Sequence, residues 1–304
     1  MKHPLAFLFD TTRVTADGER VTHLWPNDCY YAHLSIYHFG RQYCHNKFIL
    51  DAGSGAGYGS AYLADHGARL VEAVDVSEEA VRFSRKYFKR PNLRSQVMSL
   101  EQIQGFAPQS FDFIFSSNVL EHVPDVFKFF ISAHSLLKAD GVLLVAVPPV
   151  IDENSKQANL QNIFHLNIWS PRQWQHVLSI FFEEIEFYVH RFEKPGISLD
   201  FSNAPDQTTI TEEDFTFTAA ALDEYDVNCL TAVFVARKPK TDLPEIRLDF
   251  VDDSFTRPAQ KPMAGQAAPS INIILRAWKI TREQGVIKLI KKSVHYLQHY
   301  RRMH

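Results

Sequence analysis

The stretch FILDAGSGAGYGSAYLAD, residues 48–65, decides the fold of this chain. A short apolar run that ends in Asp51 leads into glycines at every second position, and a helix-like run follows. Glycines lack a Cβ, so they let the backbone of such a turn approach a bound ligand closely. The stretch therefore predicts a strand, a ligand-binding turn and a helix.

The pattern after Phe48 alternates short β-branched runs with helical runs, which is typical of a parallel sheet covered by helices. We expect strands at residues 48–52, 69–75, 93–98, 111–117, 141–147, 182–191 and 229–236. We expect helices at residues 57–66, 78–89, 125–138 and 171–181. The aromatic segment 30–39 predicts one more helix, packed against the sheet from outside. The fold class is α/β.

The chain has 304 residues, of which 45% are hydrophobic, and this is enough for one enlarged domain or one domain with an appendage. Five segments are predicted from composition, and they do not include an internal repeat. They are an N-terminal cap at 1–47, a main domain at 48–238, an insert within it at 192–228, a proline-rich linker at 239–270 and a basic amphipathic helix at 271–304.

The net charge of -3 conceals an asymmetry between the two ends of the chain. Residues 271–304 hold eight Lys and Arg against one acid, which leaves 24 basic and 34 acidic residues in 1–270. The basic helix is expected to lie on an anionic membrane surface, as a peripheral contact at the inner membrane, or to bind protein. Nucleic acid is not an expected partner, because the positive charge is terminal.

The cysteines and the N-terminus predict a cytoplasmic protein. Three cysteines without a CxxC pair indicate reduced thiols, and they indicate neither a disulfide framework nor a zinc site. The first apolar run is broken and too short for a signal peptide, and no run of about 18 apolar residues could span a membrane.

The glycine turn does not fit a dinucleotide. No register of G-x-G-x-x-G works, because Tyr58 or Ser60 stands where the third glycine belongs. A carboxylate at the end of the first strand, Asp51, would repel a pyrophosphate and attract a cation. The next predicted strand ends in Asp75, where a carboxylate can accept both hydroxyls of a ribose. S-adenosylmethionine (SAM), with its sulfonium and ammonium groups, satisfies both requirements.

The chain resembles the class I SAM-dependent methyltransferases, in particular the group that acts on small molecules and glycans. The resemblance covers residues 48–238 and rests on ILDAGSGAGYGS, VEAVDVS, SFDFIFSSNVLEHVPD and LLKADGVLLVAVP, in this order. It implies a Rossmann-like sheet of seven strands with helices on both faces, whose last strand is antiparallel and inserted beside the sixth. It also implies SAM as cofactor and S-adenosylhomocysteine as product.

The resemblance carries a set of cofactor contacts onto this sequence. The glycines would face the methionine part, Asp51 the ammonium, Asp75 the ribose, and the turn after the fourth strand the sulfonium side. Where many relatives have an acidic residue near the adenine, this chain has a Met-Ser-Leu stretch whose backbone would make the contact. The predicted cofactor-binding residues are Asp51, Gly53, Ser54, Gly55, Gly57, Asp75, Val76, Ser99, Leu100, Asn118 and Val119.

Methyl transfer from a sulfonium is a direct displacement, which needs an aligned nucleophile and exclusion of water. A hydroxyl acceptor also benefits from a base, and histidine titrates in the right range. His165, in NIFHLNIWSP after the fifth strand, is the preferred base, with an anchoring role for its loop as the equal alternative. His122, in VLEHVP, is the second candidate, although holding its own loop is the favoured interpretation. No metal is expected.

We therefore expect an O-methyltransferase acting on a sugar, a glycan precursor or a similar small metabolite. The acidic insert supports this with Phe201, Phe215, Phe217 and Tyr225, which could stack on sugar faces, although a solvated acidic surface is the commoner explanation. The basic tail loosely resembles those of enzymes of polysaccharide biosynthesis. Two alternatives remain open, namely a quinone-like or phenolic acceptor and a SAM-binding scaffold without turnover.

Overall fold

The structure is a computed structural model, and it describes residues 20–221 and 229–243. Most of the predicted linker and the whole basic helix at 271–304 lie outside the described residues, as does Tyr225. Within the described part, no helix is both long enough and apolar enough to cross a membrane.

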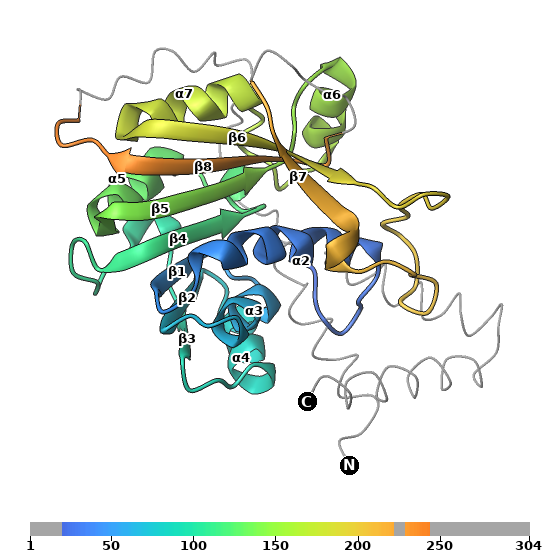
Figure 1. Ribbon diagram of the computed structural model, residues 1–304, viewed down its shortest axis with the longest axis horizontal. Coiled ribbons are helices and arrows are strands. Elements are labelled where there is room, and N and C mark those ends of the chain that lie inside the picture. Colours follow the sequence, from blue (N-terminus) through green and yellow to red (C-terminus); the bar gives the residue numbers. More distant parts are fainter. Residues whose placement is uncertain (1–19, 222–228, 244–304) are drawn as a thin grey trace.

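A single sheet of eight strands organises the described residues, in the order β3-β2-β1-β4-β5-β8-β6-β7 (Figure 1). The strands are β1 Phe48–Ala52, β2 Leu70–Asp75, β3 Leu93–Val97, β4 Phe111–Ser117, β5 Leu137–Val147, β6 Phe182–Phe192, β7 Phe215–Ala219 and β8 Thr231–Pro239. The first five pair in parallel. β8 lies between β5 and β6 and is antiparallel to both, which confirms the predicted reversal of the last strand.

The sheet has one strand more than the seven that were predicted. The additional strand, β7, comes from the insert at 192–228 and pairs antiparallel with the edge strand β6, with Phe217 opposite His190. Its sequence FTFTA alternates aromatic and hydroxyl side chains. The strand signal is weak, because the run has only five residues and lies in an acidic segment.

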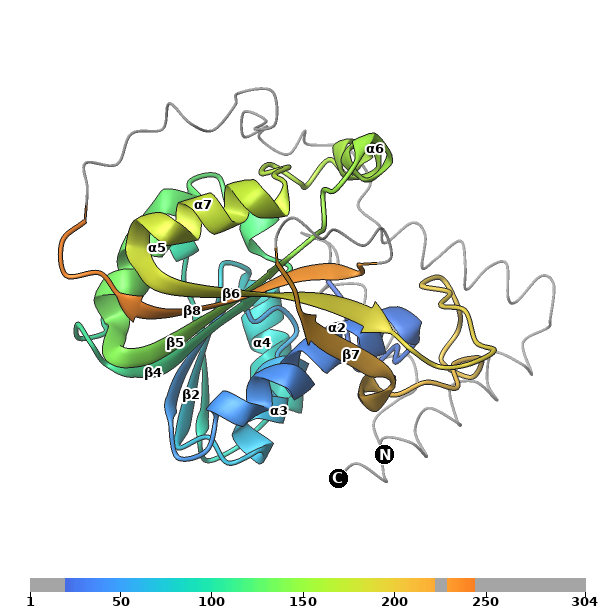
Figure 2. The same ribbon diagram turned by 45° about the horizontal axis from the view of Figure 1, so that its top comes forward.

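Helices cover both faces of the sheet, as predicted (Figures 1 and 2). One face carries α2 Asp28–Gly40, α3 Tyr58–Asp65 and α4 Glu78–Tyr87. The other face carries α5 Val126–Leu136 and α7 Pro171–Phe181. Short 3-10 helices are formed by Arg41–Tyr43, Leu100–Gln102, Leu120–His122 and Glu212–Asp214. A further helix, α6 Glu153–Gln161, was not predicted, because none of its residues is buried and its sequence has no apolar face.

The period-two alternation of the central strands builds two cores. In β1, Ile49 joins the cluster under α2 and α3, and Leu50 joins the cluster under α5 and α7. In β4, Phe113 and Phe115 face the first cluster and Ile114 faces the second. Strands buried on both faces need continuous apolar runs, and this is why their limits could be read from the sequence.

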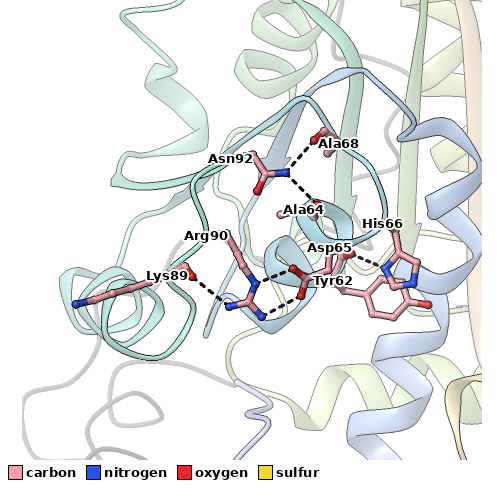
Figure 3. Close-up of polar contacts among 8 residues, drawn as sticks. All are labelled: Tyr62, Ala64, Asp65, His66, Ala68, Lys89, Arg90 and Asn92. Carbon is pink, nitrogen blue, oxygen red and sulfur yellow. Dashed lines mark hydrogen bonds and ion pairs between the residues drawn. The ribbon is translucent and has the colours of Figure 1, made fainter. Parts of the chain in front are cut away.

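The end of α3 is fastened to the start of β3 by two side chains that Figure 3 shows together. The amide of Asn92 donates to the carbonyl oxygens of Ala64 and Ala68, at 3.0 and 2.8 Å. The guanidinium of Arg90 donates to both carboxylate oxygens of Asp65, at 2.7 and 2.9 Å. These contacts fix the far end of the helix that begins at the glycine turn.

The two contacts should contribute very different amounts to stability. Asn92→Ala leaves two carbonyl oxygens of a partly buried turn without their donor, so it should lower the free energy of unfolding by about 1–3 kcal/mol. Arg90→Ala removes a solvent-accessible ion pair, and its cost should stay below about 1 kcal/mol. Urea denaturation of both variants measures the difference, and equal losses would contradict this assignment.

Candidate functional site

The glycine turn, residues 53–57, folds over the end of β2. The backbone N–H groups of Gly53 and Ser54 donate to the carbonyl oxygen of Val74, at 2.8 and 2.9 Å. Gly53, Gly55 and Gly57 all have left-handed backbone, with φ of +86°, +52° and +88°. L-residues with a Cβ rarely adopt this conformation, so the turn requires glycine.

The space around each glycine differs, and this separates their roles. A Cβ at Gly53 would lie 2.4 Å from the methyl groups of Val119, and one at Gly57 would lie 2.2 Å from Ser84 Oγ. A Cβ at Gly55 would meet no atom within 4 Å. Gly53 and Gly57 are therefore needed for packing within the protein, whereas Gly55 borders the open side from which a ligand can approach.

Asp75, the last residue of β2, lies beside this turn as predicted. Its carboxylate accepts hydrogen bonds from the N–H groups of Gly55 and Ser77, at 2.8 and 2.9 Å. The guanidinium of Arg20 donates to the same carboxylate at 3.3 Å. Val76 follows directly and is 68% exposed. The buried carboxylate and the exposed neighbour mark the edge of the site at the end of β2.

Asp51, the other predicted carboxylate, lies beneath the turn. Its side chain is buried and accepts hydrogen bonds from the hydroxyl groups of Ser60 and Tyr37. Burial raises the pKa of Asp51 to about 7, although both hydroxyl groups oppose that shift. Asp51 thus presents a proton or a negative charge to the site in the neutral pH range.

Tyr37 of α2 packs in the core and also reaches the site. Its ring stacks on Phe115 and lies so close to Gly59 that a Cβ there would be 2.0 Å away. Its hydroxyl group reaches Asp51 at 3.4 Å. One aromatic residue of α2 therefore supports the turn, its helix and its buried carboxylate.

The remaining predicted cofactor residues follow β3 and β4 at the same edge of the sheet. The N–H of Met98 donates to the carbonyl oxygen of Asp75 at 2.9 Å, which sets the turn with Ser99 and the buried Leu100 beside β2. Asn118 has a positive φ of 52°, and its N–H donates to Ala146 O at 2.8 Å. The next residue is Val119, the one that contacts Gly53.

A second group of polar residues forms where two loops meet after β4 and β5. The N–H groups of Leu166 and Asn167 donate to the carbonyl oxygen of Glu121, at 2.6 and 3.0 Å. The buried amide of Asn167 also donates to the carbonyl oxygens of Leu120 and Val123, at 2.8 and 2.7 Å. These bonds clamp segment 162–167 onto the loop that carries His122.

The clamp brings both predicted histidines together. The rings of His122 and His165 meet edge to face, with centroids 4.9 Å apart. His122 Nδ1 lies 3.0 Å from the carbonyl oxygen of Phe164, and His122 Nε2 lies 3.7 Å from a carboxylate oxygen of the buried Glu121. His165 Nδ1 lies 2.7 Å from the amide oxygen of Asn159. Each histidine therefore anchors its loop through a hydrogen bond, as the alternative interpretation expected, and both rings lie after the carboxyl ends of β4 and β5.

Among the three expected stacking residues of the insert that the structure describes, two are used for packing. Phe217 stacks on Phe39 and His190, with ring centroids 4.4 and 4.6 Å apart, and Phe215 is buried. Phe201 is 50% exposed. The insert is also fastened to the start of α2, where Asp28 accepts a hydrogen bond from Asn203 at 2.9 Å. These contacts leave less aromatic surface for a sugar than the sequence suggested.

Sequence reasoning missed several residues that complete the site. They are Arg20 and Ser60, which reach the two carboxylates, and Asn159 and Asn167, which orient the histidine region. A polar residue inside an apolar run, as in HLNIW, was the available signal for Asn167. Arg20 lies 55 residues from its partner, whereas Ser60 and Asn159 lie nine and six residues from theirs without a local pattern that marks the contact.

Part of the chain is similar to known proteins. Residues 50–145 match the family model described as a methyltransferase domain. The chain is 27% identical over 113 residues to a ubiquinone biosynthesis O-methyltransferase of Neisseria meningitidis, covering 36% of this chain and 46% of the relative. It is 34% identical over 100 residues to the enzyme of that name from Xanthomonas campestris, covering 32% and 41%. The matched region spans less than half the length of these curated relatives.

Solved structures share the fold at low sequence identity. A SAM-dependent methyltransferase of Thermotoga maritima is 15% identical, with a TM-score of 0.52, and the match covers 69% of this chain and 91% of that one. A structure of the Trm112 methyltransferase activator with a methyltransferase from Haloferax volcanii gives 19% identity and the same TM-score and coverage. These matches show a shared fold and no more.

The contact between Gly53 and Val119 can be tested apart from backbone strain. Gly53→Ala adds both a positive-φ cost and a clash, whereas Gly105→Ala, at a φ of +83° with nothing within 4 Å, adds only the backbone cost. Gly53→Ala should therefore lower the free energy of unfolding by about 1–3 kcal/mol more than Gly105→Ala. Adding Val119→Ala removes the two methyl groups but keeps a Cβ 2.9 Å away, so it should recover part of that difference, and an unchanged difference in the double variant would refute the contact.

Proposed function

We propose that the chain, whose residues 50–145 match the methyltransferase-domain model, is a SAM-dependent methyltransferase that transfers the methyl group of SAM to a hydroxyl group of a small molecule. The observation that carries the proposal is the pairing of Asp75 with the N–H of Gly55 at the open side of the glycine turn. A bidentate acceptor beside an unobstructed backbone suits a ribose joined to a chain that must pass close by.

The cofactor would take the place of one contact at Asp75. Arg20 donates to one oxygen of this carboxylate, and the ribose hydroxyls would compete for the same acceptor. The N–H groups of Gly55 and Ser77 would continue to hold the carboxylate in place. The site is thus preorganised for the sugar by backbone donors, and only a side chain has to move.

The positive charges of the cofactor would interact with the carboxyl group of Asp51. SAM brings a sulfonium and an ammonium, and the buried carboxyl group of Asp51 stands in the strand that leads directly into the glycine turn. A nearby cation favours the ionised form of a carboxyl group, so a bound cofactor would lower the pKa of Asp51. Proton loss from Asp51 would then accompany cofactor binding near pH 7.

The acceptor would bind at the cluster of Glu121, His122 and His165. In the transfer, the acceptor oxygen forms a bond to the methyl carbon while the carbon–sulfur bond breaks, and its electron pair stays on sulfur to give neutral S-adenosylhomocysteine. The hydroxyl proton must leave, and the histidine cluster at the carboxyl ends of β4 and β5 is the polar group placed to handle it. The carboxyl group of Glu121 is buried beside the ring of His122.

A phenolic or quinone-related hydroxyl is the acceptor class that we propose to test first. The relatives named as ubiquinone biosynthesis O-methyltransferases support it. The sugar acceptor expected from the insert has weaker support, since Phe215 and Phe217 are engaged in packing. The proposed class rests on relatives that match over part of their length, so both acceptors belong in the same assay.

Cofactor affinity should depend on pH through Asp51. Because burial raises its pKa to about 7, the carboxyl group is mostly protonated at pH 6 and mostly ionised at pH 8, and only the ionised form attracts the cofactor. The affinity for SAM should therefore rise by about tenfold between pH 6 and pH 8. Calorimetric titration measures it. Asp51→Asn should bind more weakly and lose most of this slope, and a slope equal to that of the unmodified chain would contradict the role of Asp51.

Transfer should depend on Asp75 and not on its neighbour in the same strand. With methyl-labelled SAM, a catechol-type phenol and a sugar nucleotide, we expect label in the phenol. Asp75→Asn should weaken SAM binding by about tenfold or more, since one good charge-assisted pair is lost. Glu72→Gln is the matched control, because Glu72 binds Arg94 and Gln96 away from the turn.

Three outcomes of this assay would contradict parts of the proposal. Label in the sugar nucleotide alone would contradict the phenolic acceptor and support the sugar acceptor. SAM binding without transfer to any acceptor would favour the scaffold alternative. Full SAM affinity in a folded Asp75→Asn variant would remove the cofactor assignment itself.

A further inference from the structure

Glu121, His122 and His165 form a cluster of one carboxyl group and two imidazoles, whereas a general base would need only one of these side chains. One ligand atom from each of the three side chains lies within 4.8 Å of the others. Glu121 is buried, and the two histidines are partly exposed. Two imidazoles and one carboxylate form a common ligand set for transition metals in catalytic sites.

The hydrogen bonds of the two rings determine which nitrogen carries the lone pair. The carbonyl oxygen of Phe164 can only accept, so Nδ1 of His122 must be the donor in that bond. The amide nitrogen of Asn159 donates to Ser155 O at 2.8 Å, which turns its oxygen toward His165 and makes Nδ1 of that ring the donor as well. In the neutral rings, Nε2 is then the lone-pair nitrogen of both histidines.

This arrangement is the one that surrounds metal-binding histidines. Such a ring usually donates its second N–H to a carbonyl or carboxylate oxygen, which fixes its tautomer and orientation. Here a backbone carbonyl and an oriented amide oxygen serve His122 and His165 in this way. On the coordinating side, Nε2 of His122 lies 3.7 Å from a carboxylate oxygen of Glu121. A neutral imidazole nitrogen and a carboxylate oxygen both carry lone pairs, so one cation can bind to the two atoms together.

We propose that Glu121, His122 and His165 bind a divalent transition-metal ion, such as zinc, manganese or cobalt. Ligand atoms about 2.1 Å from a tetrahedral ion are about 3.4 Å from one another, so closure by up to about 1.4 Å from the present limit of 4.8 Å brings the cluster to coordinating geometry. The clamp made by Asn167 already holds the two loops together without an ion. Three protein ligands leave a coordination position for an oxygen of the acceptor.

The ion gives the cluster its part in the proposed methyl transfer, and this part of the inference rests on that proposed function. A hydroxyl oxygen bound to the ion loses its proton to water more readily, because the positive charge stabilises the alkoxide or phenoxide. The oxygen then attacks the methyl carbon, and the sulfur leaves with the electron pair of the carbon–sulfur bond. His122 and His165 act as ligands in this account, with Glu121 compensating the charge of the ion.

Metal binding is tested directly on the full chain, without cofactor or acceptor. Cobalt(II) is the probe, since its visible absorption reports on nitrogen and oxygen coordination, and zinc is then added as competitor. We expect one cobalt site, displaced by zinc, that His165→Ala and Glu121→Gln weaken by at least about a hundredfold. Asn159→Ala, which removes the partner of the His165 ring, should weaken it by about tenfold or more.

His176→Ala is the matched control, because this exposed histidine of α7 is outside the cluster and its removal should leave the cobalt site unchanged. Unfolding curves show whether each variant is folded. Equal cobalt binding by the unmodified chain, folded His165→Ala and folded Glu121→Gln would overturn the site. So would the absence of any cobalt spectrum.

A second measurement separates this inference from the proposed function. Calorimetry with SAM, after treatment with a chelator, reports cofactor binding alone, and it should be unaffected by His165→Ala. Label transfer should fall at least tenfold in chelated protein and return with added metal. If chelated protein still binds SAM and still transfers the methyl group, the metal has no role in transfer and the proposed function stands. If the protein does not bind SAM, the proposed function is wrong, and the cobalt titration still decides whether the metal site exists.

Discussion

The hydrogen bond between the N–H of Gly55 and the carboxylate of Asp75 is the contact on which the site depends. It joins the turn after β1 to the last residue of β2, and it exists because adjacent parallel strands end at the same edge of a sheet. Gly55 can make it only with a left-handed backbone, and Gly53 and Gly57 are held by packing on either side. Contacts within the protein therefore set the geometry of the proposed cofactor site.

Negative charge is distributed along this edge in two different ways. Asp75 is held by backbone donors, whereas Asp51 is buried under the turn and has its pKa raised into the neutral range. Across the sheet edge, Glu121 is buried beside two imidazoles. Each carboxylate gains if a cation approaches, and this fits a cationic methyl donor on one side and a metal ion on the other. The proposed metal ligands lie on the two loops after β4 and β5.

The sequence predicted the central strands well because burial on both faces demands uninterrupted apolar residues, as in Phe113, Ile114 and Phe115. It also predicted the start of α4, where Ser77 accepts from Ala80 N–H at 3.1 Å. It missed α6, whose polar sequence has no periodic apolar face, and β7, whose five residues stand in an acidic insert. Element boundaries that depend on local residues could be predicted from the sequence. Elements that form because of tertiary contacts, such as β7, could not.

The candidate site divides along the same line. Asp51, Asp75 and the glycines could be placed from strand ends and spacing alone, since the fold brings strand ends together. Arg20, Asn159 and Asn167 reach their partners through tertiary contacts between distant or irregular segments, so nothing local in the chain indicates them. The pairing of His122 with His165 followed from topology only in part, because the clamp through Asn167 decides how close the two rings lie.

The most direct test of the account is a calorimetric comparison of SAM with a nicotinamide dinucleotide on the same preparation of the full chain. The glycine turn with two carboxylates predicts that SAM binds with one molecule per chain and that the dinucleotide, with its pyrophosphate, does not bind. Binding of the dinucleotide with no heat from SAM would contradict the assignment of this edge of the sheet to a cationic methyl donor.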